Sequence, residues 1–595
     1  MNKSLSVVKN FIVNRFSFIG LSFILTSIAC IPRFIFKESF DRNANAQFVA
    51  LAISATGIGA YLVIKNKIPK LSKKIWITLA ALFLSTAIST FAGGNIIGSM
   101  VGDVGRYTGL ISLYSLLLIA IYFATIGMDR FNHYLPYFIT GVFIVNFLCL
   151  LQRYKVITLP GDGGSGSTLG NIDFISAWIG TTLPLIMLLL GRRHLAYRIL
   201  LIIMPPLSLF LLYKLGAKQG YVDVLIFAFF LLIYIFRAKI KRFKFSLNQF
   251  SVGTTALVLF WIEAVLVIPI LKIPLLFITN EEQVVIRTTF WSSGIKMFVN
   301  KPLFGVGPDN FGYYYDQYRT LESFQKNEFL ITNDAHSSVI QSMATLGVFA
   351  MLSFAFLLLI LIRSLYINYN KYPNHRKTFY WLGVFFLIFI TNSNISPITL
   401  PNKYIFWALA GFSIGAAYNN GFINNARKVI QIPIRASIAG VTVLCIFIAG
   451  NFVYAEIRFS TALQTISKKI TPNYTNSSYL PCLIYGPMRA NLAAFNVTDD
   501  KERTKIIKKV AFKQLDLNPR CITAKTTLAR IALNERNIPI SKRLVYDLLD
   551  QAPSRRDVLN LAAIYAFTQN DYTLQRDLIK PVSYTHLTLP TKRIV

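Results

Sequence analysis

The sequence predicts an all-α polytopic membrane protein with about 12–13 transmembrane helices, one large outer loop and a C-terminal helical-repeat domain. Of its 595 residues, 54% are hydrophobic and only 15% are charged, and a soluble domain cannot bury that much apolar surface. Apolar runs of bilayer length recur along the chain. The basic residues behind the net charge of +35 cluster in the short segments between these runs. Their placement favours the cytoplasmic loops of a membrane protein over nucleic-acid binding.

The apolar runs give thirteen candidate spans, since each is long enough to cross most of a bilayer as a helix. They lie near residues 16–35, 47–65, 75–93, 108–127, 135–153, 173–191, 197–214, 221–236, 251–272, 346–362, 378–392, 403–418 and 429–454.

The distribution of Lys and Arg predicts the orientation. If the N-terminus is inside, the inside loops include "KNKIPKLSKK", "GRRHLAYR" and "RAKIKRFK", and the short outside loops hold far fewer basic residues. Because cytoplasmic loops carry the excess of Lys and Arg, we expect the N-terminus inside and the C-terminal domain outside.

These spans divide the chain into five segments. We expect N-terminal transmembrane helices over 1–272, an outer loop with the candidate catalytic residues over 273–345, C-terminal transmembrane helices over 346–455, and an outer helical domain over 456–581. Residues 582–595 begin with "VSYTHLTLPT", which resembles a translated sequencing-library adapter. We expect the natural sequence to be interrupted near Pro581, and exclude this tail from the fold arguments.

The outer helical domain contains two similar stretches. "DLNPRCITAKTTLARIALNERN" and "LDQAPSRRDVLNLAAIYAFTQND" align with Pro519 and Pro553 34 residues apart. This is the tetratricopeptide period, with Ala529 and Ala563 at the small, closely packed positions. An ordinary helical hairpin is the alternative. Because the outside is oxidising, a disulfide between Cys482 and Cys521 is a further hypothesis.

His336 is the only one of the five histidines that this topology places outside, the adapter-like tail excepted. An imidazole, with an ordinary pKa of about 6.5, is a natural proton acceptor at neutral pH. His336 is therefore the candidate catalytic residue. The alternative is that it only caps the start of the apolar helix that follows.

The segment before His336 combines a tight turn with cationic and aromatic side chains. In "KPLFGVGPDNF", Gly305 and Gly307 permit close backbone approach and Asn310 belongs to the same turn. Arg287 and Lys301 supply positive charge, and Trp291 and the tyrosines of "FGYYYDQY" offer flat faces suited to sugar rings. A structural turn with an aromatic belt at the membrane interface is the alternative.

These stretches resemble the O-antigen ligase and polymerase superfamily of bacterial envelope proteins. The resemblance rests on "RTTFWSSGIKMFVNKPLFGVGPDNF" followed by "AHSSVIQSMATLGVFA", on "STLGNIDFISAWIGTTLPL", on "GAKQGYVDVL" and on "GRYTGL", in that order of weight. Together they span most of residues 75–420. Lys218 stands where the family commonly has Arg, so charge is kept but a bidentate fork is lost.

The resemblance implies a membrane glycosyltransferase of lipopolysaccharide or polysaccharide biosynthesis in the cell envelope. Such an enzyme moves a glycan from a polyprenyl diphosphate carrier to an acceptor hydroxyl on a lipid or protein, at the outer face of the inner membrane. His336 would take the acceptor proton, and Arg106, Lys218, Arg287 and Lys301 would bind the diphosphate of the donor. Gly305, Gly307, Asn310 and Trp291 would shape the loop. No cofactor, metal or nucleic acid is expected.

Several alternatives stay open at this point. Within the superfamily, the activity could be ligation to lipid A-core, O-antigen polymerisation or O-linked transfer to protein. A metal-dependent lipid-linked glycosyltransferase would need outer carboxylates in close pairs, and the outer acids are scattered. A polysaccharide transporter or flippase suits the number of spans, but the spans hold few charges and no duplicated half. The helical repeats are a candidate surface for a protein partner.

Overall fold

The structure is a computed structural model. It describes residues 15–28, 42–103, 105–159, 166–192, 194–236, 282–319, 323, 332–419, 421, 428–467 and 499–583. All regular secondary structure in these ranges is helical, which confirms the all-α class. The predicted span near 251–272 lies outside the described residues, as does Cys482.

The chain folds into two compact units, each described here by itself. The first comprises Met1–Leu84, Gly105–Val265 and Met351–Tyr454, and the second comprises Ser85–Val104, Leu266–Ala350 and Ala455–Val595. Three of the boundaries between the units fall within long helices, which are α4 Lys73–Ala92, α15 Ser338–Lys371 and α18 Lys428–Ser467.

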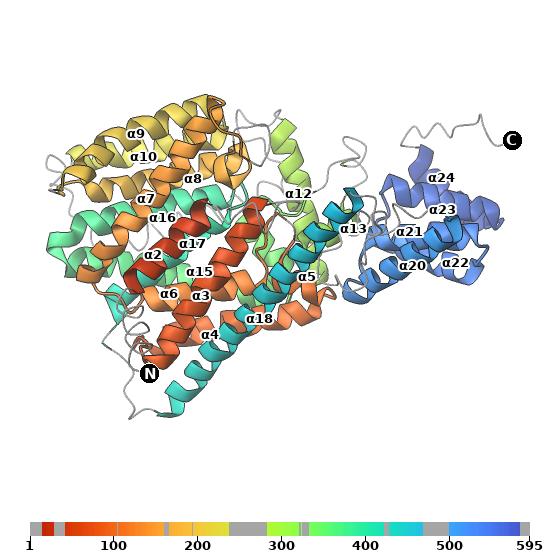
Figure 1. The fold of residues 1–595 in the computed structure, drawn as a ribbon, viewed down its shortest axis with the longest axis horizontal. Coiled ribbons are helices and arrows are strands. Elements are labelled where there is room, and N and C mark those ends of the chain that lie inside the picture. The colour runs from red at the N-terminus through yellow and green to blue at the C-terminus, as the bar shows by residue number, and fades with distance from the viewer. Residues whose placement is uncertain are drawn as a thin grey trace. The chain divides into compact units, whose positions relative to one another are not determined.

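The first unit is a bundle of apolar helices (Figure 1). Besides parts of the three long helices, its described α-helices are α2 Arg15–Ile28, α3 Arg42–Ile64, α6 Leu110–Phe123, α7 Met128–Arg153, α8 Ile172–Ile186, α9 Leu195–Leu215, α10 Lys218–Phe236, α16 Arg376–Ser393 and α17 Leu400–Tyr418. Short 3-10 turns lie at Ser167–Leu169, Met187–Leu189 and Pro373–His375.

Among the described residues, eight helices are long and apolar enough to cross a membrane. They coincide with eight of the predicted runs. Two further runs coincide with the shorter apolar helices α2 and α6, and two with α16 and α17. A helix satisfies all of its own backbone hydrogen bonds, which is what the hydrocarbon interior requires. The chain is a polytopic membrane protein.

Helix α8 is the central helix of this bundle. Of its apolar window, 83% is buried within the protein, compared with 22% for α9 and for α10. It packs against α7, α9, α10 and α16. Most of the exposed side chains of α9 and α10 are apolar, for example Ile202 and Leu225, so these two helices present faces suited to lipid.

Helices α6 and α17 approach each other closely because small residues face one another. A Cβ added at Gly411 would lie 2.1 Å from the carbonyl oxygen of Ala120, and one at Gly415 would lie 2.3 Å from that of Ala124. Both pairs are four residues apart, one turn along each helix. This is the small-residue packing that lets membrane helices come into backbone contact.

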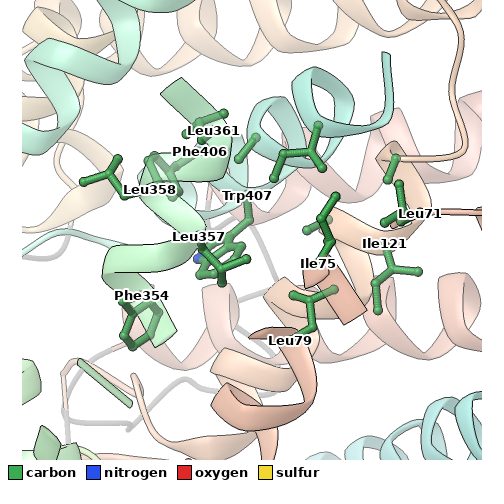
Figure 2. Close-up of a pocket in the computed structure, with 15 residues that line it drawn as sticks. Leu71, Ile75, Leu79, Ile121, Phe354, Leu357, Leu358, Leu361, Phe406 and Trp407 are labelled. Atoms are coloured by element: carbon green, nitrogen blue, oxygen red, sulfur yellow. The ribbon is translucent and has the colours of Figure 1, made fainter. Parts of the chain in front are cut away.

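An apolar pocket opens among α4, α6, α15 and α17 in the first unit. Figure 2 shows Leu357, Leu358 and Leu361 of α15 near Trp407 of α17. None of its lining residues is charged, so the pocket suits an alkyl chain and offers nothing that would bind a diphosphate. It is not the candidate active site.

The second unit contains the segment predicted as an outer loop, and much of that segment is helical. Its described helices before the C-terminal domain are α5 Ile96–Val101, α12 Glu282–Asn300 and α13 Phe311–Tyr318, with the start of α15. Trp291, which the sequence analysis assigned a structural role in a loop, lies on α12.

The C-terminal part of the second unit is an array of five successive helices (Figure 1, blue). They are α20 Asp500–Leu517, α21 Ile522–Asn534, α22 Ile538–Gln551, α23 Arg556–Thr568 and α24 Tyr572–Ser583, and each packs against the next. The starts of α21 and α23 lie 34 residues apart, as do those of α22 and α24.

The core of the array forms along one side of these amphipathic helices. Ala529 is fully buried, whereas Ala563 is only partly buried and packs at the edge of the core. Asp499 and Asn537 cap α20 and α22 by accepting hydrogen bonds from backbone N–H groups of the first turn. The helices therefore repeat with the expected period, while their assignment as tetratricopeptide repeats stays a prediction.

The cysteines fall into two groups. Cys149 and Cys445 are buried thiols in membrane helices, as expected of small packing residues. Cys521, at the start of α21, is disulfide-bonded. Its predicted pairing with Cys482 involves a residue outside the described ranges and stays a prediction.

The contact between α6 and α17 leads to the first testable prediction. Gly411→Ala should lower the thermal unfolding temperature of the detergent-solubilised protein, because the new methyl group forces two helix backbones apart at a cost of about 1–3 kcal/mol. Gly383→Ala on α16 is the matched control, since a Cβ there meets nothing within 4 Å. Equal unfolding temperatures for the two variants would contradict the close packing of α6 and α17.

Candidate active site

The turn between α12 and α13 interlocks with a kink in α15 through backbone contacts. The N–H groups of Val306 and Gly307 donate to the carbonyl oxygens of Ala344 and Thr345, at 2.9 Å in each case. The N–H of Val348 returns a hydrogen bond to Pro302 at 2.9 Å. The turn and the kinked helix thus share three backbone hydrogen bonds.

Glycine is required on both sides of this contact. Gly347 has φ 76° and ψ −175° inside α15, a conformation that is essentially restricted to glycine. Its added Cβ would lie 2.3 Å from the carbonyl oxygen of Leu303. Gly305 has φ 65°, and its Cβ would lie 2.4 Å from the carbonyl carbon of Thr345. These constraints explain why the turn sequence contains glycines at fixed positions.

Asn310 holds the same turn from its other side. Its side chain is fully buried and donates to Ser99 Oγ at 2.8 Å and to the carbonyl oxygen of Val306 at 3.0 Å. Its Oδ1 accepts from Asn95 at 3.1 Å. Asn310 therefore ties the turn to the short helix α5.

His336 occupies a strained backbone position immediately before α15. Its φ is 54°, the left-handed region that non-glycine residues rarely adopt. The carboxylate of Asp334 accepts the His336 N–H at 2.6 Å, which forms an Asx-type turn. Gln341, from the first turns of α15, accepts the Ala335 N–H at 2.9 Å. These contacts fix the direction in which the imidazole leaves the backbone.

The imidazole of His336 lies against helix α12. Its ring centroid is 5.4 Å from that of Phe290, and the His336 side chain is half-buried. Arg287 precedes Phe290 by three residues on α12, so both project from the same side of the helix. Arg287 is half-buried as well. The structure thus places the predicted proton acceptor beside the helix turn that carries a predicted donor-binding cation.

Lys301 is directed toward α13. Its ammonium group donates to the hydroxyl of Tyr314 at 3.3 Å and lies 5.0 Å from the ring centroid. The Tyr314 hydroxyl in turn donates to the carbonyl oxygen of Gly93 at 2.8 Å. Trp291 is half-buried on α12, and its indole N–H has no hydrogen-bond partner within the described residues.

Three of the sequence motifs meet at one end of α8 in the first unit. The guanidinium of Arg106 lies 5.2 Å from the ring centroid of Phe174. Asn171 caps α8 by accepting the N–H of Asp173 at 2.7 Å. Gln219, which follows Lys218 at the start of α10, donates to the carbonyl oxygen of Asp173. The start of α8 thus brings together the three motifs "GRYTGL", "STLGNID" and "GAKQG".

The predicted donor-binding cations are therefore found in both units. Arg106 and Lys218 belong to the first unit, and Arg287 and Lys301 belong to the second. Lys218 is the first residue of α10.

Sequence reasoning missed several residues of these clusters. Phe290 could have been found from its spacing to Arg287 on a helix, and Asp334 from its position two residues before His336. No spacing or motif in the sequence pointed to Asp223, which belongs to a separate contact in the first unit. It is fully buried in α10, accepts from Asn392 of α16 at 2.8 Å, and fits into space left by Gly180 of α8. This contact joins three helices of the first unit.

The chemistry available at the second-unit site is that of one imidazole against a helix that carries Arg287. No group of three or more His, Cys, Asp or Glu side chains among the described residues could hold a metal ion. The carboxylate of Asp309 accepts the backbone N–H of Asp103 at 2.7 Å, so it has a structural partner. An imidazole held beside an arginine-bearing helix can accept a proton next to an anionic ligand.

The fold and these clusters define a polytopic membrane protein with a candidate transferase site. Residues 176–355 match the model of the O-antigen ligase family, so the resemblance inferred from the motifs is confirmed over this segment. The match includes Lys218, Arg287, Lys301 and His336, and leaves out Arg106 and the C-terminal helices. It supports an O-antigen ligase-type function, in a class of glycan-transferring enzymes. No curated protein matches the chain.

The interlock of the turn with α15 can be tested at Gly347. Gly347→Ala should lower the free energy of unfolding by about 1–3 kcal/mol from the backbone conformation alone, and by more once the contact with Leu303 is included. Thermal unfolding in detergent measures the loss. Gly440→Ala on α18, where a Cβ meets nothing within 4 Å, should leave stability unchanged. A Gly347→Ala variant as stable as the control would refute the interlock.

Proposed function

We propose that this protein is an envelope glycosyltransferase that moves a glycan from a polyprenyl diphosphate carrier to an acceptor hydroxyl. The observation that carries the proposal is the position of His336. It lies in a strained turn within the segment that matches the O-antigen ligase family. Its ring lies against Phe290 of α12, which is one helical turn from Arg287.

The reaction is a single displacement. His336 accepts the proton of the acceptor hydroxyl, and the oxygen attacks the anomeric carbon of the donor glycan. A new glycosidic bond forms as the bond to the diphosphate oxygen breaks, and the polyprenyl diphosphate leaves with the electron pair. One displacement inverts the configuration at the anomeric carbon. The diphosphate is itself a good leaving group, so transfer requires no nucleotide.

Cationic side chains stabilise the charge that develops on the leaving diphosphate. In the second unit we assign this role to Arg287, on the same side of α12 as Phe290, and to Lys301. Arg106 and Lys218, in the first unit, are proposed for the same role and are to be tested by their own variants. Because cations of the protein supply this charge, we propose that transfer is independent of a metal ion.

We place the reaction at the outer face of the bacterial inner membrane, with the N-terminus inside and the C-terminal helices outside. The excess of Lys and Arg in the opposite set of loops supports this orientation. A disulfide at Cys521 agrees with this orientation, since disulfides persist outside the cytoplasm.

The acceptor can be a lipid, a growing polysaccharide or a protein. The array α20–α24 supports a protein acceptor or partner, because stacked helical hairpins offer an extended binding surface. Expression in a ligase-deficient and in a polymerase-deficient bacterium, with surface glycan followed on gels, separates the first two activities. Glycan attached to protein in either strain identifies the third.

The role of His336 leads to a prediction about transfer. His336→Ala should reach the membrane in normal amounts and lose transfer by at least about 100-fold, the usual contribution of a general base. His375→Ala is the control, since His375 lies in a predicted inside loop. The measurement is glycan formed by the purified protein from a lipid-linked donor. Full activity of His336→Ala would show that His336 has only a structural role at the start of α15.

Metal independence gives a second prediction. Treatment of the purified protein with EDTA, followed by gel filtration, should leave the transfer rate unchanged, and added Mg²⁺ or Mn²⁺ should not raise it. The reason is that the diphosphate charge is met by arginine and lysine. A rate that falls with EDTA and returns with a divalent cation would favour a metal-dependent glycosyltransferase instead.

A further inference from the structure

The C-terminal helices contact α13 through two arginines. Arg520 lies 3.7 Å from the ring centroid of Tyr314 and donates to the side-chain oxygen of Gln317 at 2.7 Å. Arg555 forms an ion pair with Asp316 at 3.5 Å. Stacking and hydrogen bonding by one guanidinium make Arg520 a specific contact that a lysine could not replace.

Both arginines occur at the same edge of the array. Arg520 lies just before the N-cap of α21, and Arg555 is the N-cap residue of α23. Since these two helices start 34 residues apart, the repeat presents one arginine per helix pair on the side that faces α13. Helix α22 also packs against α13.

The opposite side of α13 faces the candidate active site. The ring centroid of Tyr315 is 5.6 Å from that of Phe290, and Phe290 is the residue against which His336 lies. Tyr315 is almost fully buried. Adjacent residues of a single short helix therefore contact the C-terminal array on one side and the neighbour of His336 on the other.

The Asp316–Arg555 ion pair is partly buried, so it contributes more to stability than an exposed pair would. The Asp316 side chain is only 14% exposed and the Arg555 side chain 29%. Burial raises the pKa of the Asp316 carboxyl, and the charges of Arg555 and Arg319 oppose that rise. Removal of Arg555 would leave the poorly solvated carboxylate of Asp316 on α13 without this ion pair. This costs more stability than the loss of an exposed pair.

We propose that the C-terminal helical array fixes the position of α13 and thereby of the His336 segment, with Arg520 and Arg555 as positioning residues. The array is then a structural part of the candidate active site in addition to any partner that it binds. The consequence for glycan transfer rests on the proposed function, whereas the positioning itself does not.

Hydrogen exchange of the full-length protein in nanodiscs tests the positioning directly. Arg555→Met and Asp316→Asn should each increase exchange in peptides covering 311–319 and 332–341 by about tenfold, the effect of one lost charge-assisted hydrogen bond. The double variant should exchange no faster than Arg555→Met alone. Asp316→Asn removes only a contact that Arg555→Met already removes, whereas Arg555→Met also breaks the pair with Asp557 at 2.7 Å. Arg520→Ala should accelerate the same peptides. Arg530→Met, an exposed arginine on α21, is the matched control.

Unchanged exchange in these variants, or independent effects that multiply in the double variant, would overturn the inference. Transfer kinetics then separate it from the proposed function. If the wild type transfers glycan, Arg555→Met should lower kcat and leave the donor KM unchanged, and Arg555→Lys should restore part of the rate. An unaltered kcat would overturn the positioning role in catalysis. A wild type without transfer refutes the proposed function, and exchange still decides the positioning.

Discussion

The backbone contact between the turn after α12 and the kink in α15 is the constraint on which the second unit depends. Gly305 lies so close to Thr345, and Gly347 so close to Leu303, that neither glycine has room for a Cβ. Hydrogen bonds between main-chain groups leave little freedom in the register of this contact. This contact sets where α12 ends, where α13 begins and where the chain enters α15. Since His336 precedes α15 by two residues, the position of the imidazole follows from it.

The backbone at this site includes residues with positive φ that are supported by their surroundings. His336, Asp309 and Gly347 all have positive φ, and each is held by contacts that are themselves buried or made by the main chain. Left-handed residues of this kind persist only where the rest of the structure determines them, and they gather at functional sites. The buried amide of Asn310 and the edge-to-face contact of Phe290 with Tyr315 provide that support here. A general base held in this way loses little orientational freedom when an acceptor binds.

The membrane helices and the C-terminal array are stabilised by different interactions. In the first unit the solvent is hydrocarbon, so helices gain little from burying apolar faces and associate through close contact of small residues, as at Gly411 and Ala120. In the C-terminal array the solvent is water, and capped amphipathic helices bury an apolar core that includes Leu548 and Leu559. The arginines that reach α13 belong to this array, where carboxylates pair with Arg555 and the ring of Tyr314 meets Arg520.

The sequence by itself determined the helical membrane class, the position of twelve helices and the residue types of the site, because hydropathy, loop charge and motif spacing are local properties of the chain. It assigned Trp291 to a loop, although its segment folds as α12. Only the tertiary structure decided that Phe290 lies against His336, that Asp223 meets Asn392, and that Arg555 reaches Asp316. These partners are far apart in sequence and carry no periodic signal, so their pairing follows from how whole helices pack.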